Sequence, residues 1–291
     1  MVPSINPIIL ATRKSPLALA QAVLTQSYFA TCLPGIACEL LKIVTTGDQR
    51  QQWSLTEQGG KGLFTKELET ALLEGRAHVA VHSSKDLPTE LGPGLALAGF
   101  LPRAAVNDVL VYREGIPAEA IKTIATSSPR RKMQLARRFP QAQWSEIRGN
   151  VDTRLRKIAE GQADATLLAA AGLERLGIHA WPGVIFEPLK LEESVPAPGQ
   201  GAVALECRTE DAAWLAALLD AATGLAVHTE RALLDLLGGG CHSAVAAYNL
   251  GNRLLVFHEK TGFNEYTLAG STVEARMPQL RQIAVDVTRQ H

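Results

Sequence analysis

The feature that most constrains the fold is a regular alternation of short apolar runs with segments of helical periodicity. Residues 8–11 form an apolar run that predicts a strand, and Ser15-Pro16 predicts the start of a helix soon after it. The apolar face of that helix would consist of Leu17, Ala20, Leu24 and Tyr28. This strand-then-helix order is the building unit of α/β proteins.

The same order persists along the chain. Further strands are predicted over residues 39–44, 77–81, 144–147 and 165–169, and further helical segments over residues 65–74, 151–159 and 172–176. The run 124–126 followed by Ser128-Pro129 repeats the order of the first strand and helix start. Two similar α/β domains would explain this match, although one match this short also arises by coincidence. The chain is therefore expected to have an α/β fold.

Breaks rich in proline and glycine divide the chain into parts. We interpret residues 100–103 and 195–201 as crossings between domains. After Asp220 the pattern changes to a helix, a triple glycine and two short strands, which fits a small α+β domain. That helix is predicted over residues 230–237 and those strands over residues 254–257 and 266–268. The predicted domains are residues 1–99 with 200–217, residues 104–195, and residues 221–291.

Composition argues against several classes of protein. The 291 residues carry 29 basic and 29 acidic side chains, and this zero net charge argues against nucleic-acid binding. The first ten residues do not resemble an export signal, and no run approaches the ~18–20 apolar residues of a membrane span. The four cysteines lack metal-ligand spacing. We expect a cytoplasmic protein with reduced thiols, no metal, no membrane contact and no nucleic-acid partner.

Basic residues are concentrated between residues 130 and 156, where acidic residues are scarce. Ser128-Pro129 predicts the N-cap and first turn of a helix, so Arg130 and Arg131 would lie in that turn. The helix macrodipole disfavours cations there by about 0.3–1 kcal/mol each. A bound polyanion would offset this cost, because arginines and backbone N–H groups would meet the same carboxylate or phosphate. The alternative is a solvated basic helix face.

Three other segments carry possible chemistry. Residues 59–66 surround Lys61 and Phe64 with glycines, which suits either a flexible loop or a lid over a ligand. Lys85-Asp86 follows a predicted strand, where open α/β sheets bind ligands, although surface pairs of this kind are common. Cys241 follows three glycines, so its thiol is either exposed and reactive or a small buried hydrophobe.

Several motifs follow one another in a fixed order. They are Ala11-Thr12-Arg13-Lys14-Ser15-Pro16-Leu17-Ala18, Gly60-Lys61-Gly62-Leu63-Phe64, Val81-His82-Ser83-Ser84-Lys85-Asp86-Leu87-Pro88, Thr126-Ser127-Ser128-Pro129-Arg130-Arg131, Arg148-Gly149-Asn150-Val151-Asp152-Thr153-Arg154-Leu155, Ala171-Gly172-Leu173-Glu174-Arg175-Leu176, Pro198-Gly199-Gln200-Gly201-Ala202, and Glu230-Arg231 followed by Gly239-Gly240-Cys241. In this order, from about residue 8 to residue 246, the chain resembles the porphobilinogen deaminase (hydroxymethylbilane synthase) family.

The resemblance implies a fold, a cofactor and a reaction. It implies two α/β domains like those of type II periplasmic binding proteins, and a third, small α+β domain that presents Cys241. Cys241 would hold a dipyrromethane covalently through a thioether. Four molecules of the substrate porphobilinogen would be joined head to tail with loss of ammonia, and hydrolysis would release hydroxymethylbilane for tetrapyrrole biosynthesis. The family also implies a monomer.

The resemblance further assigns roles to single residues. Asp86 would be catalytic, interacting with pyrrole nitrogens and stabilising the positive charge that develops as ammonia leaves. The acetate and propionate groups of cofactor and substrate would be bound by Arg13, Ser15, Lys85, Ser128, Arg130, Arg131, Arg148 and Arg154, with Arg175 and Gln200 lining the same cleft. Lys61 and Phe64 would belong to a lid.

Two departures from the family pattern lie near Cys241. The family usually has a β-branched residue and then proline at the positions of Ser243 and Ala244, so the loop would be less rigid here. The region after Cys241 is also shorter than usual. The residues alone are equally compatible with a non-enzymatic binding protein for a small polyanion, and a covalent cofactor on Cys241 would distinguish the two.

Overall fold

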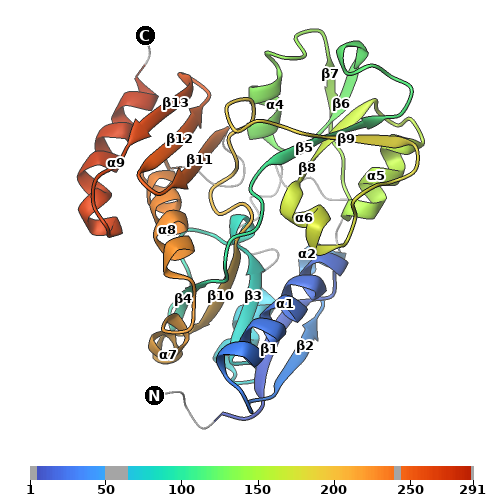
Figure 1. Cartoon of the computed structure of the whole chain (residues 1–291). Helices are drawn as coiled ribbons and strands as arrows, with labels where there is room; N and C mark the ends of the chain where they lie inside the picture. Colours follow the sequence, from blue (N-terminus) through green and yellow to red (C-terminus); the bar gives the residue numbers. More distant parts are fainter. Residues whose placement is uncertain (1–4, 50–64, 239–243, 290–291) are drawn as a thin grey trace. The chain divides into compact units, whose positions relative to one another are not determined.

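The computed structural model describes residues 5–49, 65–238 and 244–289. The chain forms two compact units, Met1–Arg103 with Ala202–Gly224, and Ala104–Gly201 with Leu225–His291. Figure 1 shows a sheet flanked by helices in each of them. Because the first unit is made of two segments, residues far apart in the sequence share one sheet.

The sheet of the first unit has five strands in the order β2-β1-β3-β10-β4. Strand β1 is parallel to β2 and β3, whereas β10 is antiparallel to β3 and β4. The strands are β1 (Ile8–Arg13), β2 (Cys38–Ile43), β3 (Val79–Ser83), β4 (Leu95–Phe100) and β10 (Val203–Arg208). The helices are α1 (Pro16–Cys32), α2 (Thr46–Gln49), α3 (Lys66–Leu73), α7 (Ala212–Ala216) and the 3-10 helices η1 (Ser84–Asp86) and η3 (Thr209–Asp211).

Both faces of this sheet are covered. Leu10 and Val81 pack with Phe29 of α1 on one face, while Ala11 and Ala80 pack with the α3 side chains on the other. Successive residues of a strand point to opposite faces, so a strand covered on both sides has a continuous apolar run rather than an alternating one. This explains the apolar runs from which the strands were predicted.

The second unit contains another five-stranded sheet, in the order β7-β6-β8-β5-β9. Strand β6 is parallel to β7 and β8, whereas β5 is antiparallel to β8 and β9. The strands are β5 (Asp108–Arg113), β6 (Thr123–Ala125), β7 (Gln143–Ser145), β8 (Ala165–Ala169) and β9 (Val184–Pro188). The helices are α4 (Pro129–Leu135), α5 (Val151–Ala159), α6 (Ala170–Arg175) and the 3-10 helix η2 (Ala118–Ala120).

The two sheets share one topology. In the first sheet, β1 lies between its parallel neighbours β2 and β3, and the antiparallel β10 separates β3 from the edge strand β4. In the second sheet, β6 lies between its parallel neighbours β7 and β8, and the antiparallel β5 separates β8 from the edge strand β9. Each first strand also leads to a Ser-Pro helix start. The hydroxyl oxygens of Ser15 and Ser128 accept the N–H groups of Ala18 and Arg131, both at 3.4 Å. The repeat seen in the sequence is therefore structural, and the prediction of two similar α/β parts is confirmed.

The C-terminal part is a three-stranded antiparallel sheet with two helices, as expected for a small α+β domain. Its elements are α8 (Ala221–Leu236), β11 (Val245–Leu250), β12 (Arg253–His258), β13 (Gly262–Thr267) and α9 (Val273–Thr288). Along β12, Leu254 and Val256 pack with α8 and α9. Leu255 and Phe257 face the other way and pack with Val106 and Val195. Both faces of this small sheet are therefore buried.

Two details of the sequence prediction are wrong. Helix α1 buries Ala18, Gln21, Ala22, Thr25 and Phe29 rather than the expected face, and Leu24 is 41% exposed. Small and apolar side chains lie on nearly every face of α1 itself, so periodicity could not identify the buried face. Helix α8 begins at Ala221 instead of residue 230. Local sequence patterns also did not predict β4, β5, β9, β10, β11, α9 or the short helices α2 and α7.

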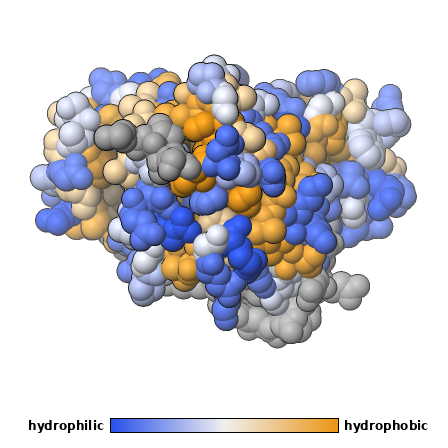
Figure 2. Space-filling view, turned by 90° about the horizontal axis from the view of Figure 1, so that it is seen from below, coloured by the Kyte–Doolittle hydropathy of each residue, from blue (hydrophilic) through white to orange (hydrophobic). Residues whose placement is uncertain are grey.

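Within the described part of the chain, no helix is both long enough and apolar enough to cross a membrane. Apolar side chains do reach the surface, as on the face shown in Figure 2, where they are interspersed with hydrophilic residues. Val23, Leu73 and Leu250 are each more than half exposed.

Candidate functional site

In the first unit, two predicted site residues lie at the same edge of the sheet. Arg13 is the last residue of β1, and Asp86 closes η1 directly after β3. These two strands are parallel neighbours, with Leu10 beside Val79. Their carboxyl ends therefore meet at one edge, which is where open α/β sheets bind ligands.

Arg13 is held by a carboxylate that sequence reasoning did not identify. Its Nη2 donates to Asp48 Oδ1 at 2.5 Å and its Nε donates to Oδ2 at 3.3 Å. Burial raises the pKa of Asp48, but hydrogen bonds from Arg13 and Thr45 and the charge of Arg13 outweigh burial, so the pKa is lowered. Asp48 thus stays ionised and fixes the guanidinium at the strand end.

Asp86 differs from Arg13 in having no such partner. Its side chain is exposed and forms no hydrogen bond or ion pair with a residue in the described ranges, Lys85 included. Lys85, next to it, is half-buried. Ser15 is half-buried and is the N-cap of α1. The carboxylate of Asp86 is accordingly available to an external cationic or N–H group.

In the second unit, the remaining predicted residues follow the strands at the equivalent edge. Ser128, Arg148 and Arg175 come after the carboxyl ends of β6, β7 and β8. Strand β5 runs in the opposite direction, and its first residue, Asp108, lies beside Ala169, the last residue of β8. One edge of this sheet therefore gathers several cations and one carboxylate.

Asp108 joins three of the predicted residues into one buried network. Its Oδ1 accepts Nη2 of Arg131 at 2.6 Å, Nε of Arg131 at 3.1 Å and Nε2 of Gln200 at 2.9 Å. Its Oδ2 lies 2.8 Å from Nη1 of Arg130 and accepts the hydroxyl of Ser194 at 2.8 Å. Asp108 is fully buried, and Arg130 and Arg131 are 4% and 7% exposed.

The charges in this network depend on one another. Burial alone would raise the pKa of Asp108, but the two guanidiniums outweigh burial and hold it far below its ordinary value. Burial also lowers the pKa of Arg130, while the charge of Asp108 opposes that shift. A buried charge is tolerated only when it is paired and hydrogen-bonded. The carboxylate therefore allows two adjacent arginines to remain charged at the start of α4.

Arg175 is a half-buried cation of a different kind. Its Nη2 donates to the carbonyl oxygen of Gly201 at 2.6 Å, and its Nε is buried without a hydrogen-bond partner. No carboxylate in the described ranges lies within ion-pair distance of it. Burial lowers the pKa of Arg175, with the charge of Glu174 opposing the shift. A guanidinium in this state is suited to bind an anionic group supplied by a ligand.

Arg148 and Arg154 are brought together by the turn that precedes α5. Nε of Arg154 donates to the carbonyl oxygen of Gly149 at 2.8 Å, and Arg148 makes a long 3.4 Å contact with the exposed Glu146. Gly149 has φ +112°, and a Cβ there would lie 2.8 Å from Thr153 Cγ2. Glycine is required at this position because a side chain would be both strained and obstructed.

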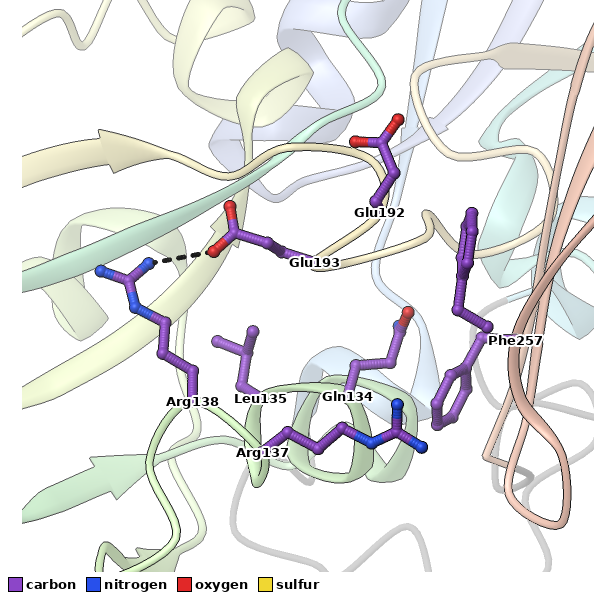
Figure 3. A pocket seen from close by; sticks show the side chains of 8 residues that line it. Gln134, Leu135, Arg137, Arg138, Glu192, Glu193 and Phe257 are labelled. Carbon is purple, nitrogen blue, oxygen red and sulfur yellow. Dashed lines mark ion pairs between the residues drawn. The ribbon is translucent and has the colours of Figure 1, made fainter.

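Two basic residues that precede Arg148 in the sequence are arranged differently. Arg137 and Arg138, just beyond α4, line a pocket of about 140 Å³ with Gln134, Leu135, Glu192, Glu193, Phe257 and Phe263. Figure 3 shows the guanidinium of Arg138 directed at Glu193. Arg138 also pairs with Glu187 at 2.7 Å. Arg138 therefore pairs with Glu187 and Glu193 instead of Asp108, the carboxylate that pairs with Arg130 and Arg131.

Three predicted residues, Lys61, Phe64 and Cys241, lie outside the described residues. Among those that are described, no group of histidine, cysteine and acidic side chains could hold a metal ion. Sequence reasoning missed Asp48 and Asp108, each of which holds a predicted arginine. The available signal for Asp108 was a single acidic residue before the apolar run 109–111, which does not reveal its partner.

Comparison with known proteins gives a consistent result. Residues 8–216 match the family model described as porphobilinogen deaminase, dipyromethane cofactor binding domain. A protein of Sphingopyxis alaskensis named porphobilinogen deaminase is 48% identical over 254 residues, covering 84% of this chain and 79% of that protein. One of Sorangium cellulosum with the same name is 46% identical over 247 residues, covering 82% and 81%.

A solved structure, the periplasmic aliphatic sulphonate binding protein of Escherichia coli, aligns with 80% of this chain and 70% of its own at 14% identity and a TM-score of 0.44.

The family model covers more than half of the chain, and both named relatives are close to half identical over most of their length. The chain therefore belongs to the porphobilinogen deaminase family.

Proposed function

We propose that this protein is a porphobilinogen deaminase, a transferase that joins four porphobilinogen molecules head to tail with loss of ammonia and releases hydroxymethylbilane by hydrolysis. Besides family membership, the observation that carries this proposal is the half-buried Arg175, whose guanidinium has no carboxylate partner among the described residues and whose Nε is buried. Each pyrrole brings two carboxylates, and arginine binds such groups through two parallel hydrogen bonds.

The described residues fit the dipyrromethane cofactor named in the family model. Arg175 lacks an anion, and Arg130, Arg148 and Arg154 lie along the same sheet edge. We propose that these residues, with Ser128, Arg131 and Gln200, bind the acetate and propionate groups of cofactor and substrate. When attached to Cys241 through a thioether, the dipyrromethane would supply the pyrrole position to which the first substrate is joined.

We assign the catalytic role to Asp86. Its carboxylate is exposed and directly follows the carboxyl end of β3. It would accept hydrogen bonds from pyrrole N–H groups and stabilise the positive charge that develops as ammonia leaves. Arg13, held by Asp48, together with Ser15 and Lys85, would bind substrate carboxylates at the same edge of the first sheet.

Further assignments follow from the family resemblance and from the sequence pattern. We propose that Lys61 and Phe64 belong to a lid and that the enzyme works as a monomer in the cytoplasm. We also propose that residues 1–99 with 200–217, 104–195 and 221–291 are its three domains.

Mass spectrometry of the intact protein tests the proposal. The purified protein should be heavier than its sequence mass by one dipyrromethane, and peptide mapping should place the adduct on Cys241. Cys241→Ser should lose both the added mass and turnover. The matched control is Cys38→Ser, since burial raises the pKa of the Cys38 thiol and so lowers its reactivity. A fully active protein at its bare sequence mass would falsify the proposal.

A further inference from the structure

We propose that Asp108 is a positioning residue that holds Arg130 so that one edge of its guanidinium is presented to a ligand carboxylate. The inference rests on the proposed function, because it concerns the same anion-binding wall. It adds a residue that is not itself expected to touch substrate or cofactor, since its carboxylate is fully buried and already accepts hydrogen bonds from two other residues besides the arginines.

The hydrogen bonds of Arg130 are confined to one of its nitrogens. Nη1 lies 2.8 Å from Asp108 Oδ2 and donates to the carbonyl oxygen of Val195 at 2.6 Å. Nε and Nη2 form no hydrogen bond with any residue in the described ranges. These two nitrogens make up the side edge through which a guanidinium binds a carboxylate with two parallel bonds. Asp108 thus occupies one end of the group and leaves the bidentate edge for a ligand.

Arg131 has the opposite arrangement. Its Nε and Nη2 both donate to Asp108 Oδ1, and its Nη1 donates to the carbonyl oxygen of Leu167 at 2.8 Å. All three nitrogens are therefore engaged within the protein. Of these two adjacent arginines, Arg130 is therefore the one that leaves its bidentate edge unused by the described residues, while Arg131 also supports Asp108.

Asp108 is itself fixed from three parts of the chain. It begins β5, its partners Arg130 and Arg131 lie on α4, and Ser194 and Gln200 come from the segment after β9. A buried ionic cluster is weak evidence for stability, because apolar replacements of similar volume are often as stable. A cluster that leaves one bidentate edge unused is better explained by orientation of that edge than by stability alone.

The test compares Asp108→Asn, Ser194→Ala and a matched control, Asp164→Asn. Asp164 precedes β8 at the opposite end of the same pair of strands, where it pairs with Arg113 at 3.3 Å and accepts two backbone N–H groups. Four quantities are measured on folded protein. They are KM and kcat for porphobilinogen, the fraction of protein carrying the dipyrromethane mass, and succinate affinity by calorimetry.

Asp108→Asn should raise KM and weaken succinate binding about tenfold or more, because a charge-assisted bond is lost, while kcat of the loaded fraction changes less. Ser194→Ala should act in the same direction and less strongly. Asp164→Asn should lower thermal stability and leave KM and succinate binding within about twofold of the wild type, as expected of a structural carboxylate.

Unchanged or tighter succinate binding in Asp108→Asn would overturn the proposal, since removing a negative charge without loss of orientation strengthens anion binding. If Asp108→Asn does not fold, Ser194→Ala decides, and an unchanged KM and succinate affinity in that variant would overturn it. A wild-type protein without the dipyrromethane mass refutes the proposed function, but the dependence of succinate binding on Asp108 can still be measured and stands or falls separately.

Discussion

Two pairs of adjacent arginines at the two ends of α4 have the same composition and different environments. Arg130 and Arg131 are buried and share Asp108. At the other end, the side chain of Arg138 is 30% exposed, pairs with Glu187 and lies 5.1 Å over the ring of Phe139. Arg137 is exposed and lines the pocket of Figure 3. What separates the pairs is their position relative to the sheet edge, not local charge density.

The difference has an energetic meaning. Removing one partner of a buried ion pair leaves an uncompensated charge and costs about 3–5 kcal/mol. Partly exposed pairs contribute about 0–1 kcal/mol, because water and salt screen them. The two ends of one short helix should therefore respond very differently to the same substitution.

The largest effect is expected from Arg131→Ala. Asp108 would lose both bonds that it receives from Arg131, so unfolding free energy should fall by about 3–5 kcal/mol and loading of the dipyrromethane should be impaired. Denaturant unfolding and intact mass measure these changes. The comparison fails if Arg138→Ala lowers stability as much as Arg131→Ala does.

Asp86→Asn should have a large effect of another kind. Its carboxylate has no partner in the described part of the chain, so stability and substrate binding should be nearly unchanged. Turnover should fall by well over tenfold, on the order of 2 kcal/mol or more, if the charge acts in the transition state. Steady-state kinetics with a thermal melt separate the two effects, and near-normal turnover would remove Asp86 from the mechanism.

The dependence of stability on acid pH should reveal the buried ion pairs that Asp108 forms with Arg130 and Arg131. The two guanidiniums hold the pKa of Asp108 below that of an unfolded aspartate, so its contribution to stability is complete above about pH 3.9. It declines as the pH falls below that value toward the lower pKa of the folded state. Between pH 5 and pH 2, stability should therefore fall more steeply in the wild type than in Asp108→Asn. Parallel curves from denaturant titrations would contradict this assignment.

The smallest effects are expected from Arg137→Gln and Arg138→Gln. Their place later in the sequence predicts that both are mostly solvated, so each variant should lose less than about 1 kcal/mol and keep activity within about twofold. The structure adds a distinction, since the hydrogen bond and charge of Glu187 raise the pKa of Arg138. Arg138→Gln should be the more destabilised variant in a thermal melt.

Local signals identified much of the fold. The Ser-Pro helix starts, the apolar strands and the two sheets were predictable because capping and strand burial leave marks within a few residues. Strand β10 was not predicted, although it lies between β3 and β4, because pairing partners more than 100 residues away leave no local mark. The buried face of α1 was missed because nearly all sides of that helix are apolar or small.

The site was predictable to a similar extent. Position after a predicted strand identified Lys85-Asp86 as a candidate, whereas Arg13 and Arg175 were assigned by the family resemblance. Which arginine presents a free edge and which is used internally depends on Asp108, more than 20 residues earlier in the chain. Such a pairing is decided by tertiary packing, so no pattern within α4 predicts it.

The position of β10 has a consequence for how the protein is made. All five strands of the second sheet lie between residues 108 and 188, so this sheet has all its strands as soon as that segment leaves the ribosome. The first sheet lacks a central strand until residue 208 is available, and until then β3 and β4 present unpaired edges. Such long-range pairing is slow to form and exposes strands to aggregation. Strands β3 and β4, synthesised before the second sheet, therefore gain their last partner only after it, and the nascent chain is most in need of chaperones while residues 104–201 emerge.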